Sequence, residues 1–157
     1  MKISLTINQQ LNTFDVSDNT LLVQLIREQA GLTGTHIGCD TSQCGACTVL
    51  VDGHAIKSCS VLAAQMQDAK LTTIEGVAEP DGTLHPMQAA FKECHGLQCG
   101  FCTPGMVLSA IDIYNQHPNA SATEIRDLLE GNICRCTGYH NIVKAIQLGA
   151  KNMSSPQ

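Results

Sequence analysis

Hydrophobic and polar residues alternate at the start of the chain. Lys2–Asn8 alternates as a half-buried strand does, and Leu11–Val16 continues after a polar break, which predicts an opening hairpin. The apolar residues then recur at helical spacing, and this pattern stops at Gly31. Glycine commonly follows the end of a helix. The apolar positions of this predicted helix are Leu21, Leu22, Leu25 and Ile26.

A loop and a second hairpin follow. Thr33–Cys47 is rich in Gly, Thr and Ser and has no period, which is typical of a loop folded around a bound group. Two short strands, Thr48–Val51 and His54–Lys57, flank Asp52 and Gly53. This dipeptide favours a type I′ turn, because both central residues of that turn need a positive φ.

The remainder of the first half completes a small sheet. We expect a short helix over Val61–Met66 and a strand over Leu71–Ile74. A sheet of this size crossed by one helix is the β-grasp pattern. The sequence therefore predicts an α+β protein whose first domain, residues 1–76, is a β-grasp domain.

Strand-like alternation ends near a turn at Glu79–Gly82. We therefore expect a linker over residues 77–85 and a helical domain over residues 86–157. Four amphipathic helices of this length can bury their apolar faces only against each other, which predicts a small four-helix bundle.

Capping residues mark the helices of this second domain. Pro86–Cys94 is the first helix, and Thr103 and Pro104 supply an N-cap and a first-turn proline for the second. Ser121 and Glu124 form a capping box for the third. The residues expected to face the core are Met106, Val107, Ala110, Ile111, Tyr114, Ile125, Leu128, Leu129, Ile142, Val143 and Ile146.

Composition excludes several classes of protein. A formal net charge of −5, 3% aromatic residues and no Trp argue against a nucleic-acid partner. No apolar run approaches the roughly 18 residues that span a membrane. The chain shows no secretory leader, and its nine cysteines are an odd number, so we expect free or metal-bound thiols in a reducing cytoplasm.

Eight of the nine cysteines form two groups with metal-site spacing. The first quartet reads C-x4-C-x2-C-x11-C, the spacing by which plant-type ferredoxins hold a [2Fe-2S] cluster. The second quartet reads C-x2-C-x31-C-x-C and supplies its sulfurs as two close pairs. The first quartet is Cys39, Cys44, Cys47 and Cys59, and the second is Cys99, Cys102, Cys134 and Cys136. Two clusters in one small chain indicate an electron relay.

A short internal repeat raises the question of whether the ninth cysteine is also a ligand. The stretch Gln43–Thr48 reappears as Gln98–Thr103, and Cys94 precedes Cys99 by the interval that separates Cys39 from Cys44. Spacing alone therefore makes Cys94 a candidate ligand. We favour its exclusion, because the other four already complete a site and a spare cysteine is usually a small buried or half-buried thiol.

Structural zinc is the alternative for either quartet, since two close cysteine pairs are its usual signature. The first quartet argues against zinc, because its spacing is typical of [2Fe-2S] sites. Glycines beside the cysteines support a cluster, because a residue without Cβ lets backbone amides approach inorganic sulfur. These glycines are Gly38, Gly45 and Gly100. No nucleophile elbow, phosphate-binding loop or carboxylate pair is present, so substrate chemistry is expected on another chain.

With both quartets in view, the chain resembles the small iron-sulfur subunit of the molybdenum hydroxylases, the xanthine oxidase and aldehyde oxidoreductase family. The resemblance extends from Thr20 to about Ala150, and Thr35–Ser42 is most similar to the carbon-monoxide-dehydrogenase type. Its most specific stretches are Gly38–Val49, Gly96–Gly105 and Gly131–Tyr139.

The resemblance implies a heterotrimer. A large chain would hold a molybdenum-pterin cofactor and a medium chain would hold FAD, and two such heterotrimers could form a dimer. Electrons would pass from molybdenum through the helical-domain cluster and the β-grasp cluster to FAD. By the same resemblance, Cys136 and Gln98 lie nearest the pterin, and Gln98 hydrogen-bonds to it.

Two other functions remain as alternatives at this stage: a free-standing two-cluster ferredoxin and a zinc-stabilised interaction module. The substrate of the complex is open among carbon monoxide, aldehydes and N-heterocycles. The reduction potentials, the final electron acceptor and the role of Cys94 are open as well.

Overall fold

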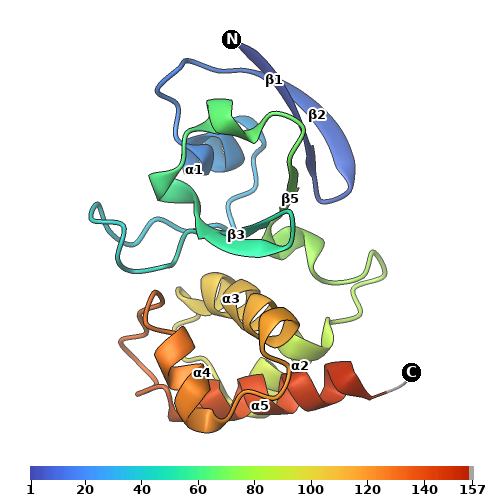
Figure 1. Ribbon diagram of the computed structural model, residues 1–157, viewed down its shortest axis with the longest axis vertical. Helices are drawn as coiled ribbons and strands as arrows, with labels where there is room; N and C mark the ends of the chain where they lie inside the picture. The colour runs from blue at the N-terminus through green and yellow to red at the C-terminus, as the bar shows by residue number, and fades with distance from the viewer. Residues whose placement is uncertain (156–157) are drawn as a thin grey trace.

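The computed structural model describes residues 1–155 and consists of a sheet-bearing half and a helical half (Figure 1). The strands all lie before residue 73, and the four longer helices all lie after residue 85. This confirms the predicted order of a β-grasp domain followed by four helices. Pro156 and Gln157, the last residues of the predicted helical domain, lie outside the described residues.

Five strands form one mixed sheet in the order β2-β1-β5-β3-β4. The β1–β5 pair is parallel, and the other neighbouring pairs are antiparallel. The strands are β1 (Lys2–Ile7), β2 (Gln10–Asp15), β3 (Thr48–Val51), β4 (His54–Lys57) and β5 (Lys70–Thr72). The predicted strand at Leu71–Ile74 is thus shorter and earlier than expected, because Ile74 already begins a 3-10 turn, η4 (Ile74–Gly76).

Both hairpins of the sheet turn through two residues of positive φ. Asp52 and Gly53 have φ of 50° and 87° and join β3 to β4, as the dipeptide predicts. Asn8 and Gln9 play the same part between β1 and β2, with φ of 47° and 70°. Primed turns suit these tight hairpins because their twist matches that of the strands.

The helix that crosses the sheet begins as α1 (Leu22–Gln24) and continues as a π-helical turn, η1 (Leu25–Gln29). Gly31 follows with φ 70°, which ends the helix as its sequence position predicts. The expected helix at Val61–Met66 is a 3-10 helix, η3 (Ala63–Met66). The core between helix and sheet consists of Ile3, Leu5, Ile7, Val16, Leu22, Leu25, Ile26, Val49, Ala63 and Leu71.

Four helices make up the second half: α2 (Pro86–Glu93), α3 (Thr103–Gln116), α4 (Ala122–Leu128) and α5 (His140–Ser154). The predicted capping box of α4 is present, since the Ser121 hydroxyl accepts from the Glu124 N–H and the Glu124 carboxylate accepts from the Ser121 N–H. The predicted Thr103 cap of α3 is wrong. Cys102 is the N-cap, and the Thr103 hydroxyl has no hydrogen-bond partner among the described residues.

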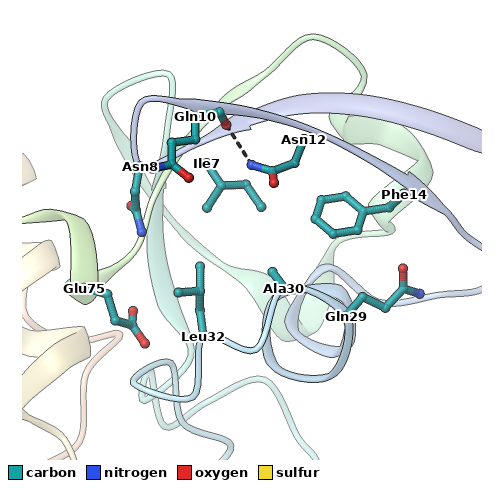
Figure 2. Close-up of a pocket in the computed structure, with 9 residues that line it drawn as sticks. All are labelled: Ile7, Asn8, Gln10, Asn12, Phe14, Gln29, Ala30, Leu32 and Glu75. Atoms are coloured by element: carbon teal, nitrogen blue, oxygen red, sulfur yellow. Dashed lines mark hydrogen bonds between the residues drawn. The ribbon is translucent and has the colours of Figure 1, made fainter.

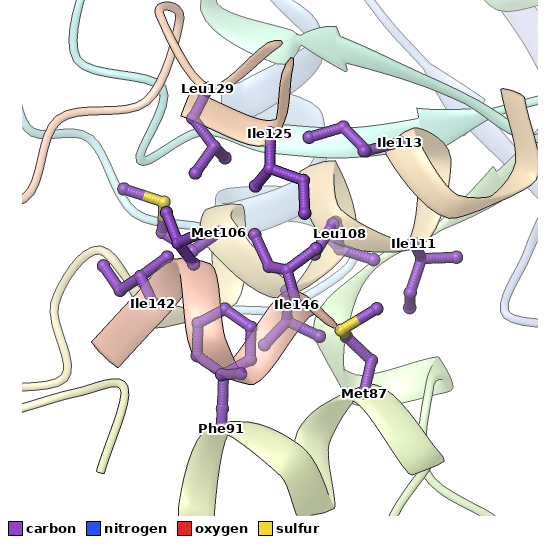
Figure 3. Close-up of a cluster of buried hydrophobic side chains, with 14 of the residues drawn as sticks. Met87, Phe91, Met106, Leu108, Ile111, Ile113, Ile125, Leu129, Ile142 and Ile146 are labelled. Atoms are coloured by element: carbon purple, nitrogen blue, oxygen red, sulfur yellow. The ribbon is translucent and has the colours of Figure 1, made fainter. Parts of the chain in front are cut away.

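The core of the helical half gathers side chains from all four helices (Figure 3). Phe91 and Met87 of α2 project from below toward Ile142 and Ile146 of α5, and Met106 of α3 lies above them. Leu128 is an exception to the predicted core, because it is 41% exposed, whereas its neighbours Ile125 and Leu129 are buried.

Strand β3 connects the two halves because it is covered on both faces. Val49 belongs to the core under α1, while Leu50 belongs to the helical core. In Figure 1, α3 runs directly beneath β3, and the two elements are in contact. The helical half therefore packs against the sheet through β3, and this packing brings the two cysteine loops together.

Candidate iron-sulfur centres

The first quartet lies on one loop and one turn. Cys39 and Cys44 belong to the loop before β3, Cys47 directly precedes β3, and Cys59 lies on a 3-10 turn, η2 (Ser58–Ser60), after β4. Hairpin β3–β4 returns the chain, so that Cys59 comes back beside Cys47. The predicted loop of Thr33–Cys47 contains no strand or helix, and Ser42, with φ 58°, takes part in folding it.

Backbone amides point at the sulfurs of this loop. The Cys44 N–H donates to Cys39 Sγ at 3.4 Å, and the Ala46 N–H donates to Cys44 Sγ at 3.5 Å. Several hydrogen bonds lower the pKa of the Cys39 thiol from 9.0 to about 6, and the one from the Cys44 backbone contributes most. Amides that stabilise a thiolate also stabilise sulfur bound to iron, so the loop suits a cluster ligand.

The second quartet lies on two loops of the helical half. Cys99 and Cys102 precede α3, and Cys134 and Cys136 lie between α4 and α5. Cys136 Sγ is 3.6 Å from Cys99 Sγ. Cys99 and Cys136 are exposed, whereas Cys134 is buried and Cys102 is half-buried. One edge of this site therefore faces outward.

The sulfurs of each quartet meet in pairs. Cys136 Sγ is hydrogen-bonded to Cys99 Sγ in the second quartet. In three further pairs a neighbouring thiol contributes to the pKa shift of its partner: Cys44 to that of Cys39, Cys59 to that of Cys47 and Cys134 to that of Cys102. Within residues 1–155, no three ionisable side chains surround the position of a single ion. Two thiolates for each of two irons is the arrangement that a [2Fe-2S] cluster takes, so the donor set fits the group in both halves.

Each quartet also contains a shielded thiol. Burial raises the pKa of Cys47 to about 11 and that of Cys102 to about 12. A thiol must lose its proton to bind iron, so metal must offset this cost at both positions. Without metal, Cys47 and Cys102 therefore stay protonated at neutral pH. A bound cation would be needed to stabilise their thiolate forms.

Two positioning residues were not identified from the sequence. Ser58, which is fully buried, donates from both its N–H and its hydroxyl to the Cys47 carbonyl, and so fixes the turn that carries Cys59. The Tyr139 hydroxyl accepts from the Cys134 N–H at 2.9 Å. Tyr139 has φ 67°, which is a strained value for a large residue. The spacing of the cysteines in the sequence does not predict this conformation.

The loops of the two quartets are hydrogen-bonded to one another. The Ile133 N–H donates to the Cys44 carbonyl at 2.8 Å, and the buried Asn132 amide donates to the Gly45 carbonyl at 3.2 Å. A Cβ added to Gly45 would overlap the Gly131 carbonyl. The absence of a side chain at Gly45 therefore serves the contact between the two loops.

A second contact between the loops involves His36 and Phe101. Their rings stack with centroids 4.5 Å apart, and His36 Nδ1 lies 2.7 Å from the Phe101 carbonyl oxygen. Phe101 lies between Cys99 and Cys102 in the chain, and a Cβ at Gly38 would lie 3.1 Å from the Phe101 ring. The loops that carry the two quartets are thus in contact at both of these places.

Two further residues were singled out in the sequence: Cys94, the ninth cysteine, and Gln98, the predicted contact with the pterin. Cys94 follows α2 and packs against the helical core, and no side-chain hydrogen bond joins it to another cysteine within residues 1–155. Gln98 is exposed, and its Nε2 donates to the Cys136 carbonyl at 3.1 Å. The structure therefore brings Gln98 and Cys136 together at the exposed edge of the second quartet.

A groove of about 400 Å³ lies between the β1–β2 hairpin and the segment after η1 (Figure 2). Four apolar residues, four amide residues and Glu75 line it, and none of these nine residues is a cysteine. Glu75, the one ionisable residue among them, accepts from the Thr73 hydroxyl at 2.6 Å and the Gly34 N–H at 2.7 Å. Its carboxylate is therefore structural. Within residues 1–155, no helix has the length and apolarity needed to cross a bilayer.

Comparison with known families agrees with this geometry. Residues 5–74 match the 2Fe-2S iron-sulfur cluster binding domain, and residues 73–147 match the [2Fe-2S] binding domain. Together the two matches contain all eight predicted ligands. The chain therefore carries two [2Fe-2S] domains in tandem.

Similar proteins are iron-sulfur subunits of oxidoreductases. Caffeine dehydrogenase subunit gamma of Pseudomonas sp. (strain CBB1) is 47% identical over 92% of this chain and 88% of its own length. The aldehyde oxidoreductase iron-sulfur-binding subunit PaoA of Escherichia coli (strain K12) is 41% identical over 99% of this chain and 74% of its own. A chain of quinoline 2-oxidoreductase from Pseudomonas putida 86 superposes with a TM-score of 0.91 at 42% identity, covering 96% of this chain and 94% of that one. Likeness at this level over nearly the whole length shows that the chain belongs to the family of small iron-sulfur subunits of the molybdenum hydroxylases.

Proposed function

We propose that this chain passes electrons from a molybdenum-pterin centre on a large subunit to FAD on a medium subunit, in a heterotrimer or a dimer of heterotrimers. A molybdenum-pterin centre would supply the two-electron oxidation of a substrate, and FAD would accept the electrons. The residues of this chain hold two clusters close together and leave an edge of each accessible. The eight cysteines of the two quartets are the proposed ligands.

One observation carries the proposal: the cysteine loops of the two halves are directly hydrogen-bonded. The bond from the Ile133 N–H to the Cys44 carbonyl joins the residue before Cys134 to a cysteine of the first quartet. An electron that crosses between the quartets therefore has a short route made of covalent bonds and one hydrogen bond.

The exposure of the cysteines supports a direction for the relay. Cys99 and Cys136 are exposed beside Gln98, and this edge is the proposed contact with the pterin. Gln98 has one amide N–H on the Cys136 carbonyl, and its amide oxygen can accept from a pterin amine. The half-exposed Cys39 would face the FAD subunit.

The proposed domains follow the fold: a β-grasp domain over residues 1–76, a linker over 77–85 and a helical domain over 86–157. The linker contains a turn in which the Gly82 N–H donates to the Glu79 carbonyl at 2.9 Å. We place the complex in the cytoplasm, because iron-bound thiolates persist best in a reducing compartment. Aldehydes and N-heterocycles are the proposed substrate classes, by analogy with the names of the similar proteins.

The test is native purification of the tagged chain from its own host, followed by electron paramagnetic resonance of the reduced sample. We expect two larger subunits to co-purify, one with molybdenum and one with FAD, and two distinct [2Fe-2S] signals. Recovery of the chain alone with both signals would indicate a free-standing ferredoxin. Recovery with zinc and no iron would indicate an interaction module and would overturn the proposal.

A further inference from the structure

Lys57 links the strand that leads to Cys59 with the loop of the first quartet. It is the last residue of β4, and its Nζ donates to the Ser42 carbonyl at 2.8 Å and the Gln43 carbonyl at 3.2 Å. These two carbonyls lie in the loop between the first two cysteines of the quartet. One side chain thus joins the two segments that must close around the same bound group.

The joined loop is strained where Lys57 holds it. Ser42 has φ 58°, in the left-handed region that side chains other than glycine rarely adopt. Its hydroxyl lies 3.8 Å from Cys59 Sγ. A strained residue persists when its surroundings hold it in place, and the Lys57 hydrogen bonds provide that support beside the fourth thiol.

The lysine side chain lies against the helical half. It is half-buried, and a Cβ added to Gly131 of the helical half would lie 3.5 Å from Lys57 Cε and 3.6 Å from Nζ. Within residues 1–155 its ammonium forms no ion pair. Asp112 lines the same cavity of about 210 Å³ but forms no ion pair with Lys57. The positive charge of Lys57 therefore faces the loop without a carboxylate partner.

We propose that Lys57 is a positioning residue for the β-grasp cluster, that it closes the cysteine loop, and that its charge raises the reduction potential of this cluster. The proposal rests on the proposed function, because it requires a cluster on the first quartet. By formal charge, four thiolates, two irons and two sulfides change from about −2 to about −3 on reduction. A fixed cation nearby stabilises the more negative state, so reduction becomes easier.

The experiment is a redox titration of the iron-loaded full-length chain, followed by electron paramagnetic resonance, for wild type, three Lys57 variants and the control variants named below. Lys57→Met removes both the charge and the donors, Lys57→Gln keeps a donor without the charge, and Lys57→Arg keeps both. Cys47→Ala and Cys102→Ala identify which signal belongs to which quartet. The iron released on dilution is measured in parallel.

We expect Lys57→Met to shift the β-grasp signal to lower potential and to speed loss of iron from that site, with the helical-domain signal unchanged. Lys57→Gln should show the same downward shift, and Lys57→Arg should restore the wild-type potential. Lys92→Met, on the exposed face of α2, is the matched control and should change neither potential.

The proposal is overturned if Lys57→Met leaves the potential and the iron content of the β-grasp site unchanged. It is equally overturned if both signals move together, since that would indicate a general effect on folding. Complete loss of the β-grasp signal with the helical signal intact would support the closing role. Absence of both signals in the wild type would instead count against the proposed function, which separates the two failures.

Discussion

The Ile133 N–H donates a hydrogen bond of 2.8 Å to the Cys44 carbonyl, across a sequence separation of 89 residues. This bond joins the loop that precedes Cys134 to the loop of the first quartet. The neighbouring Asn132 supplements it, because its side chain contacts Gly45 and Thr48 of the first half and Ser109 of α3. The relative position of the two cysteine sites therefore depends on a few buried polar contacts.

Replacing Asn132 by leucine should destabilise the protein by about 2 kcal/mol or more. The substitution keeps the volume but removes the acceptor of the buried Ser109 hydroxyl and one of the three donors to the Gly45 carbonyl. An unsatisfied buried polar group costs about 1–3 kcal/mol. Urea unfolding of the iron-loaded chain measures the loss. Asn119→Leu, at an exposed turn, is the control and should change stability by less than about 0.5 kcal/mol. Equal effects of the two variants would contradict the role of Asn132.

Replacing Gly45 by alanine should cost more than the same change at Gly82. Both glycines have positive φ, 72° and 88°, which penalises alanine by about 1–2 kcal/mol. The added Cβ at Gly45 would also overlap the Gly131 carbonyl, whereas nothing lies within 4 Å of that at Gly82. We expect a further loss of about 1–3 kcal/mol for Gly45→Ala. The thermal unfolding midpoints report the difference, and similar midpoints would show that the close approach of the loops is not required.

Removing one ligand from either quartet should remove one cluster. Cys47→Ala and Cys102→Ala should each lower the iron content from about four to about two per chain, with a matching loss of inorganic sulfide. Cys94→Ala is the control and should retain about four. Iron and sulfide assays on protein isolated without air make the comparison. Retention of full iron by either ligand variant, or loss of a cluster by Cys94→Ala, would show that the ligand set is different.

Alkylation of protein prepared without iron should distinguish Cys39 from Cys47. Amide hydrogen bonds led by that of Cys44 lower the pKa of Cys39 to about 6, whereas burial raises that of Cys47 to about 11. Only the thiolate reacts, so the Cys39 rate should rise through pH 6 and level off above it, while Cys47 stays protonated and slow at neutral pH. Mass spectrometry after iodoacetamide pulses measures both rates in one sample. The same pH midpoint for the two residues would contradict the difference in their environments.

Features that depend on residues close together in the chain could be predicted from the amino-acid sequence. The period of Lys2–Asn8, the Asp52-Gly53 turn and the Ser121 capping box each involve groups a few positions apart, and all three are present in the structure. The spacing of the first quartet is informative for the same reason, since one loop holds three of its four cysteines. Even here local signals can mislead, because Thr103 follows the true N-cap of α3.

Contacts between groups far apart in the chain could not be predicted in this way, because they depend on the folded arrangement. The pairing of Cys99 with Cys136, the bond from Ile133 to Cys44 and the reach of Lys57 to Ser42 depend on how the chain returns to itself. The apolar residues of β3 predict a strand but not that both of its faces are covered. Contacts of this kind arise when two packed surfaces come together, and the residues that make them leave no periodic signal along the chain.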